Sequence, residues 1–188
     1  MTQARAEYQA QVLGLPLERL KFIDESGVNV ARTRPFGRAP RGVRVPDAVP
    51  KDHGRNVTVL GTLSCRGLEA VMTVDGPTDA AVFRAYVEPV LAPTLVTGDL
   101  VVMDNLSAHK VAGIQAVIEA TGAPLLYLPP YSPDFSPIEP CWSKLKSYLR
   151  TVKAKTREAL DVALTGALDT ITAADARGWF KHCGYALQ

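Results

Sequence analysis

Hydrophobic and polar positions along this chain form two kinds of pattern, short apolar runs and longer runs with helical spacing. The short runs predict buried strands. Five such strands are predicted, at residues 20–24, 57–65, 68–74, 100–104 and 125–128. Arg66 and Gly67 separate the second strand from the third, so these two strands are expected to form a hairpin. The first three strands are then antiparallel neighbours.

Between and after the later strands, apolar residues recur at steps of three and four, the spacing of a helix with one buried face. Helices are predicted to begin near Thr78, Val111, Ser136, Thr156 and Thr172. Three antiparallel strands followed by alternating helices and strands favour an α/β fold with a mixed five-stranded sheet and helices on both faces. The sequence predicts one domain over residues 20–188, with C-terminal helices at 156–188, preceded by a short helix or arm at 1–19.

One long stretch, residues 30–55, is rich in Arg, Gly and Pro and has little periodicity. Loops of this length inside a compact domain are usually functional, so an irregular hairpin or loop insertion is predicted here. Seven basic residues lie between Arg32 and Arg55, and a second basic run covers residues 144–157. Such runs are either solvated faces or surfaces for a polyanion, and both interpretations stay open at this point.

Composition narrows the class of protein. With 188 residues, 47% hydrophobic and 21% charged, the chain is typical of a soluble globular domain. No signal peptide is visible, and no apolar run approaches the roughly 20 residues that span a bilayer. The three cysteines show no CxxC spacing, which argues against a disulfide framework and a zinc site. We therefore expect a cytoplasmic protein.

Three acidic residues are candidates for chemistry. Asp24 and Asp104 each end a predicted strand, and ligands bind at the carboxyl edge of open α/β sheets. If the first and fourth strands are parallel neighbours, these two acids meet, and Glu139 at a later helix start can join them. Three close carboxylates suit a hard cation such as Mg²⁺ or Mn²⁺. Glu25 is a weaker candidate, because strand alternation points it away from Asp24.

Each of these acids also has a plainer interpretation. Aspartates at strand ends are common turn formers. Ser136 is a good N-cap, Pro137 suits the first helical position, and Glu139 then falls at the third, so Ser136 and Glu139 are expected to form a capping box. Taken singly, each acid favours this plainer interpretation. Lys146 shares one edge of the helix with Glu139.

Four motifs add a resemblance to a known family. They are FIDESG at 22–27, RPFGRAPRG at 34–42, VVMDNLSAHK at 101–110 and LPPYSPDFSPIEPCWSKLK at 128–146. In this order they resemble the catalytic domain of DDE transposases of the bacterial insertion-sequence 630 family, in the mariner superfamily. In that family thirty-four residues separate the second and third acids, and thirty-four residues lie between Asp104 and Glu139.

The resemblance implies an RNase H-like fold in which Asp24, Asp104 and Glu139 hold two Mg²⁺ or Mn²⁺ ions. It implies that water first cuts a strand at the transposon end, and that the freed 3′-hydroxyl then attacks target DNA, commonly at TA. It further implies a homodimer in the DNA synapse. Ser136 stands where the family commonly has asparagine. Relatives carry N-terminal helix-turn-helix domains, so we expect end recognition to come from an upstream reading frame.

Several residues near the motifs are expected to support the site. Asn105 and His109 either position the site or form ordinary turn hydrogen bonds. The residues expected to contact double-stranded DNA are Arg34, Arg38, Arg41, Arg44, Lys110, Lys144 and Lys146. Two competing functions stay open: another RNase H-like nuclease, such as an RNA–DNA hybrid hydrolase or junction resolvase, and a non-catalytic DNA-binding remnant.

Overall fold

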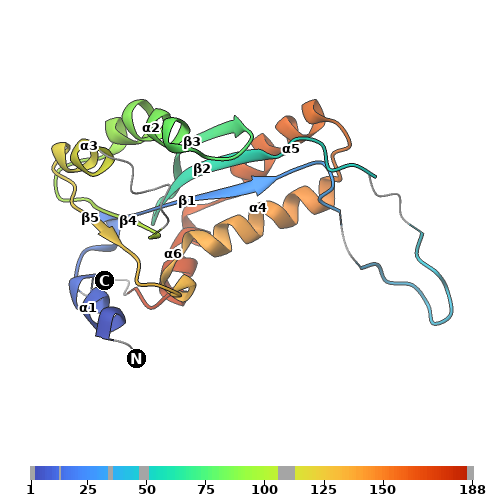
Figure 1. Ribbon diagram of the computed structural model, residues 1–188. Coiled ribbons are helices and arrows are strands. Elements are labelled where there is room, and N and C mark those ends of the chain that lie inside the picture. The colour runs from blue at the N-terminus through green and yellow to red at the C-terminus, as the bar shows by residue number, and fades with distance from the viewer. Residues whose placement is uncertain (1–2, 13, 34–35, 47–50, 106–112, 186–188) are drawn as a thin grey trace.

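The computed structural model describes residues 3–12, 14–33, 36–46, 51–105 and 113–185 (Figure 1). Its centre is a five-stranded sheet in the order β3-β2-β1-β4-β5. The strands are β1 (Leu20–Val28), β2 (Val57–Ser64), β3 (Gly67–Asp75), β4 (Leu100–Met103) and β5 (Leu125–Tyr127). Antiparallel pairing joins β3, β2 and β1, whereas β1, β4 and β5 are parallel. The prediction of a mixed five-stranded sheet is confirmed.

Strand β1 is longer than predicted, because it does not end at Asp24. It pairs with β4 over Leu20–Ile23, and it pairs with β2 over Phe22–Val28. The ladder to β2 supplies backbone partners for the polar stretch after Asp24, so the turn preference of Ser26 and Gly27 is overridden. Asp24 therefore lies inside β1, at the point where its pairing with β4 ends.

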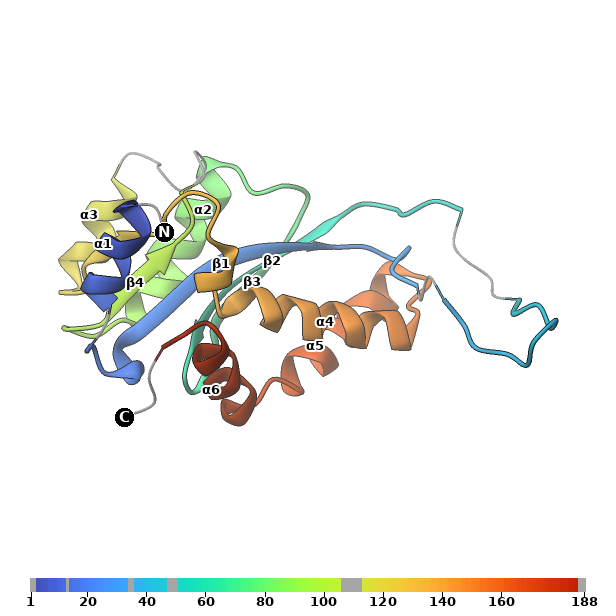
Figure 2. The same cartoon turned by 90° about the horizontal axis from the view of Figure 1, so that it is seen from below.

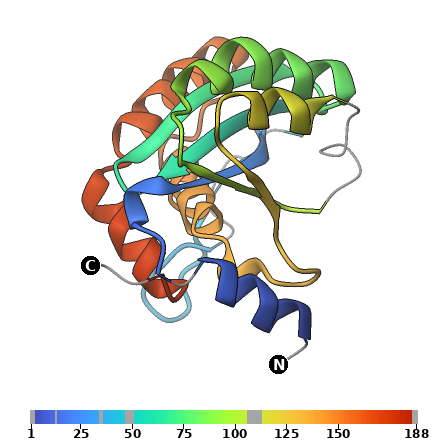
Figure 3. The ribbon, with the colours of Figure 1, turned by 90° about the vertical axis from the view of Figure 1, so that its left-hand side faces the viewer.

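Helices cover both faces of the sheet (Figures 1 and 3). One face carries α4 (Ile138–Val152), α5 (Arg157–Asp169) and α6 (Ala173–His182). The other carries α2 (Ala80–Tyr86) and α3 (Ile114–Ala120). Successive residues of β1 alternate between the two hydrophobic cores, since Phe22 packs in the core with α4 and Ile23 in the core with α2. Asp24 faces the α4 side of the sheet.

The helix predicted to begin near Thr78 is interrupted. The helical spacing from Thr78 to Leu91 predicted one continuous helix, but α2 ends at Tyr86 and a π-helical turn covers Val87–Leu91. Pro89 lies inside this turn. Because proline has no N–H to donate, the α-helical hydrogen-bond ladder cannot continue through it.

Two segments lie outside the sheet and its helices. Helix α1 (Gln3–Val12) packs near the amino end of β1, with Tyr8 and Val12 buried in the core with α4 (Figure 2). The described residues between β1 and β2 extend away from the body and contain neither helix nor strand. In this part of the chain the predicted insertion is thus an irregular loop. Among the helices described, none is long and apolar enough to cross a membrane.

Candidate active site

The three candidate acids line one cleft at the carboxyl edge of the parallel strands. Asp24 comes from β1, Asp104 directly follows β4, and Glu139 lies in the first turn of α4. Ile23 and Met103 are paired across β1 and β4, so Asp24 and Asp104 are the next positions on neighbouring parallel strands. The cleft has a volume of about 180 Å³ and is lined by Ile23, Asp24, Asp104, Leu128, Tyr131, Ser132, Pro133, Ser136 and Glu139. The predicted meeting of Asp24 and Asp104 is confirmed.

Asp24 is half-buried, whereas Glu139 is exposed. Burial raises the pKa of the Asp24 carboxyl to about 7, and the charges of Glu139 and Asp104 add to this effect. The backbone of Glu25 and the indole of Trp142 act in the opposite direction by hydrogen bonding. Trp142 donates from Nε1 to Oδ2 of Asp24 over 2.9 Å. This bond fixes the orientation of a carboxyl that the protein environment otherwise favours in its neutral form.

Gly61 makes room for that indole. It lies in β2 directly opposite Asp24 in the sheet register. A Cβ atom at this position would stand 3.0 Å from Cη2 of Trp142 and 3.1 Å from Cδ1 of Leu68. Neither Gly61 nor Trp142 is among the site residues predicted from the sequence. The available signal was a glycine inside a strand, which often marks a close approach by another group.

The start of α4 differs from the predicted capping box. The helix begins at Ile138, and Pro137 at the capping position makes no side-chain cap bond within the described structure. Ser136 instead ends a 3₁₀ turn at Pro133–Phe135, where its N–H donates to the carbonyl of Pro133 over 3.0 Å. Glu139 is therefore the second helical residue, and its N–H donates to the carbonyl of Ser136 over 3.2 Å. The capping-box prediction is wrong because the amide that Glu139 would bind is already occupied.

The donor set suits a hard cation. Three carboxylates face one cleft, and a bound cation would relieve both the burial of Asp24 and its repulsion by Glu139 and Asp104. Across the described residues, no three His, Cys, Asp or Glu side chains stand together closely enough to hold an ion as they are arranged. The carboxylates thus share a cleft without forming a closed set of ligands.

A group of basic side chains lies beside the acids. Burial lowers the pKa of Lys146, and the charges of Arg32 and Arg150 lower it further, while Glu139 and Asp24 oppose the shift. Arg32 donates from Nη2 to the carbonyl of Gly27 over 2.8 Å. Its buried Nε has no hydrogen-bond partner among the described residues. Three cations that repel one another, one with an unused donor, form a suitable environment for a phosphate group.

The structure separates the other predicted site residues. Lys144 donates from Nζ to Oδ2 of Asp175 over 2.6 Å and to the carbonyl of Thr170 over 2.8 Å, so it joins α4 to the start of α6 and is not brought to the cleft. Asn105 is exposed beside Asp104. The loop between β1 and β2 projects from the body (Figure 1), and we call it the projecting loop. On it, Arg38, Arg41 and Arg44 are exposed. Outside the described residues lie Arg34, His109 and Lys110.

With the site in view, comparison with known proteins places the chain in a family. The model of the DDE superfamily endonucleases matches residues 19–161. Because this match covers most of the chain, the chain belongs to the DDE superfamily of endonucleases, and the prediction of a DDE-type enzyme is confirmed. No match was found among the curated proteins.

Solved structures of Mos1 transposase share the fold of this chain. A Mos1 transposase paired-end complex with the left transposon end aligns with a TM-score of 0.72 and 13% identity, over 95% of this chain and 55% of that one. The Mos1 transposase catalytic domain with raltegravir and Mg aligns with a TM-score of 0.66 and 13% identity, over 96% and 84%. The chain therefore has the RNase H-like fold of the mariner transposase catalytic domain, as predicted, and spans about half the length of the Mos1 chain in that complex.

Proposed function

We propose that this chain is the catalytic domain of a transposase of the insertion-sequence 630 type, which cuts DNA at transposon ends and joins the cut end to target DNA. The observation that carries the proposal is the meeting of Asp24, Asp104 and Glu139 in one cleft of a DDE-family domain. Each acid comes from a different element, and the sheet register brings the first two together. Turn formation and helix capping do not explain why three acids from different elements line the same cleft.

Asp24, Asp104 and Glu139 would hold two Mg²⁺ or Mn²⁺ ions. When bound, such ions activate the attacking oxygen and stabilise the leaving oxygen of a phosphodiester. Asp24 releases its proton on binding, because a cation offsets the burial that favours its neutral form. Trp142 keeps Asp24 oriented through the hydrogen bond from its Nε1. Glu139, at the N-terminal end of α4, is placed where the helix dipole favours its charge.

The basic residues divide into two groups in this proposal. Arg32, Lys146 and Arg150 hold a backbone phosphate of the DNA beside the cleft, where their charges add. Arg38, Arg41 and Arg44 contact DNA from the projecting loop, together with Arg34 and Lys110. Asn105 and His109 support the second acid. Lys144 has a structural partner in Asp175, so we assign it to fold stability.

The proposal includes partners and location. The Mos1 structures that resemble this chain include a pre-cleavage transpososome and a strand transfer complex, which supports DNA as the partner. For this chain we infer transposon-end and target DNA, the latter at TA, and a homodimer in the synapse. Residues 20–188 form the catalytic domain, and a helix-turn-helix region from an upstream frame recognises the ends. The site of action is the bacterial cytoplasm, at the nucleoid.

Cleavage of labelled DNA tests the proposal. The protein is incubated with DNA carrying candidate inverted repeats, with the end-recognition region supplied separately, in Mg²⁺ or Mn²⁺. Nicking that depends on the metal ion is expected, and Asp104→Asn should abolish it with the circular dichroism spectrum unchanged. Asp169→Asn, at an exposed position at the end of α5, is the matched control and should nick normally.

Three other outcomes contradict the proposal. Nicking by Asp104→Asn at the wild-type rate rejects the acid assignment. Binding of DNA without cleavage in either metal ion identifies a non-catalytic remnant. Preferential cleavage of RNA–DNA hybrids or four-way junctions identifies another RNase H-like nuclease.

A further inference from the structure

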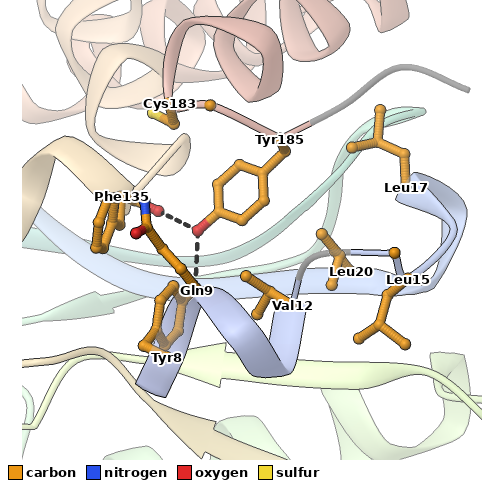
Figure 4. Close-up of a pocket in the computed structure, with 11 residues that line it drawn as sticks. Tyr8, Gln9, Val12, Leu15, Leu17, Leu20, Phe135, Cys183 and Tyr185 are labelled. Atoms are coloured by element: carbon orange, nitrogen blue, oxygen red, sulfur yellow. Dashed lines mark hydrogen bonds between the residues drawn. The ribbon is translucent and has the colours of Figure 1, made fainter. Parts of the chain in front are cut away.

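One wall of the cleft is a short loop that leads directly into α4. We call residues 131–137 the cleft loop, and its members Tyr131, Ser132, Pro133 and Ser136 line the cleft. Because α4 has no side-chain cap at its described start, the position of Glu139 depends on how this loop is held. Two distant segments hold it: helix α1 and Tyr185 near the C-terminus (Figure 4).

Arg5 of α1 binds the outer side of the cleft loop. Its Nη1 donates to Oγ of Ser132 over 2.8 Å and to Oδ1 of Asp134 over 3.0 Å, while its Nη2 donates to Oδ2 of Asp134 over 2.5 Å. The same guanidinium stacks on the ring of Phe135, with 4.1 Å from Cζ to the ring centroid. One side chain thus contacts three residues of the loop, and a planar guanidinium is suited to combine such a paired bond with stacking.

Two tyrosines hold the inner side of the loop. The Tyr185 hydroxyl donates to the carbonyl of Phe135 over 2.6 Å, and the Tyr8 hydroxyl lies 2.7 Å from the Tyr185 hydroxyl (Figure 4). Since Tyr185 uses its proton on the carbonyl, Tyr8 donates to Tyr185. The Tyr8 ring stacks on Phe135, with 5.5 Å between centroids and an angle of 13°. The two hydroxyls and the carbonyl therefore form one chain of buried hydrogen bonds.

The same Tyr185 ring also contacts the strand that carries Asp24. It meets Phe22 edge-on at 5.3 Å between centroids, and Phe22 precedes Asp24 by two residues on the same face of β1. Tyr185 therefore spans from β1 to the cleft loop, and so from one acid-bearing element to the other. A cavity of about 40 Å³ lies beside the two tyrosines.

We propose that Arg5, Tyr8 and Tyr185 are positioning residues that set the place of Glu139 relative to Asp24 and Asp104. The inference rests on the proposed function, because it assigns these residues to the assembly of that metal site. Groups that orient ligands without touching the metal change its affinity strongly when removed. A residue that merely stabilises the fold would lower the melting temperature without a selective effect on metal binding.

Two variants and two matched controls test the inference. Tyr185→Phe removes one buried hydroxyl at the cleft loop, and Tyr86→Phe removes one buried hydroxyl on the other face of the sheet, where it bonds Thr62 over 2.6 Å. Arg5→Gln removes the ion pair at the loop, and Arg66→Gln removes an exposed ion pair with Glu69 at the hairpin. Mn²⁺ binding is measured without DNA by electron paramagnetic resonance, alongside melting temperature and amide hydrogen exchange of residues 135–140.

We expect Tyr185→Phe and Arg5→Gln to weaken Mn²⁺ binding by about tenfold or more. They should also accelerate hydrogen exchange at the start of α4. Both controls should bind Mn²⁺ as the wild type does, even where they lower the melting temperature. Wild-type Mn²⁺ affinity in both loop variants overturns the inference, and Arg5→Gln keeps it testable if Tyr185→Phe does not fold. If the wild type itself binds no Mn²⁺, the proposed function fails. Independently of that result, unchanged amide hydrogen exchange at residues 135–140 in the variants rejects the positioning role of Arg5 and Tyr185.

Discussion

At the scale of single residues, the site depends on Asp24 being held under conditions that oppose its charge. Its carboxyl is buried, two further carboxylates share its cleft, and one indole N–H binds it. Such a group lowers stability in the metal-free protein and gains from a cation. This is the pattern expected where function and stability conflict.

The pH dependence of stability follows from the raised pKa of Asp24. Between pH 4 and pH 7 the folded state binds a proton at Asp24 that the unfolded state has lost, so the free energy of unfolding falls as pH rises. The whole effect is on the order of 4 kcal/mol as an upper bound. Asp24→Asn should flatten this slope and stabilise the metal-free protein at pH 8, as measured by urea unfolding with chelator present. The same slope in wild type and variant would contradict the assignment.

Gly61→Ala tests the close packing behind Asp24. The added Cβ would press on Trp142 and Leu68, and overpacking of this kind costs about 1–3 kcal/mol. A shifted indole no longer aims its N–H at Asp24, so nicking should slow by about tenfold or more. Gly27→Ala in β1 is the control, because no heavy atom among the described residues lies within 4 Å of its added Cβ. Equal nicking rates for the two variants would reject a role for the indole.

At the scale of elements, α4 carries two lysines with different surroundings. Lys144 binds Asp175 and the carbonyl of Thr170 at the end of α5, whereas the charge of Lys146 is opposed by Arg32 and Arg150. Lys144→Ala should lower the free energy of unfolding by about 0.5–1.5 kcal/mol and leave DNA affinity unchanged. Lys146→Ala should weaken DNA binding without loss of stability, because its charge is disfavoured in the free protein. Filter binding and thermal unfolding of both variants provide the check, and a DNA defect in Lys144→Ala alone would reverse the assignment.

At the same scale, the sequence predicts some elements of the fold correctly and others only in part. The apolar runs ending in Asp24 and Asp104 predicted two strands, because strand ends and acid positions are local signals. The meeting of the two acids also required these strands to be parallel neighbours, a condition that the pairing of β1 with β4 meets. The extension of β1 past Asp24 depends on pairing with β2, which no local preference records. The capping box failed for a different, local reason, since the 3₁₀ turn just before the helix had already taken the amide of Ser136.

The supports of the site were harder to predict than its acids. Trp142 looked like an ordinary core residue of α4, and its bond to Asp24 joins residues 118 positions apart. Arg5 and Tyr185 lie outside every catalytic motif, and their contacts with Ser132 and Phe135 depend on the final packing. Family motifs identify residues that perform chemistry, whereas residues that hold them in place are spread along the chain.

At the scale of the whole molecule, the loop between β1 and β2 extends away from the sheet and its helices (Figure 2), and Arg38, Arg41 and Arg44 are exposed on it. Replacing Arg38, Arg41 and Arg44 together by Gln should weaken DNA binding and reduce its salt dependence. If each contacts one phosphate, the slope of log K against log salt falls by about 0.9 per residue, or roughly 2.7 in all. Fluorescence anisotropy at several salt concentrations measures this slope. An unchanged slope assigns the three arginines to solvent.

The bond between Tyr8 and Tyr185 has a consequence for biosynthesis. These residues stand 177 positions apart, so the buried hydroxyl of Tyr8 in α1 is satisfied only after Tyr185 has been synthesised. Contacts of such long sequence separation form late, because the intervening chain must be ordered first. The sheet and α4 can assemble on the nascent chain while the cleft loop is still loose. A domain built in this way would complete the support of its cleft only after Tyr185 has left the ribosome.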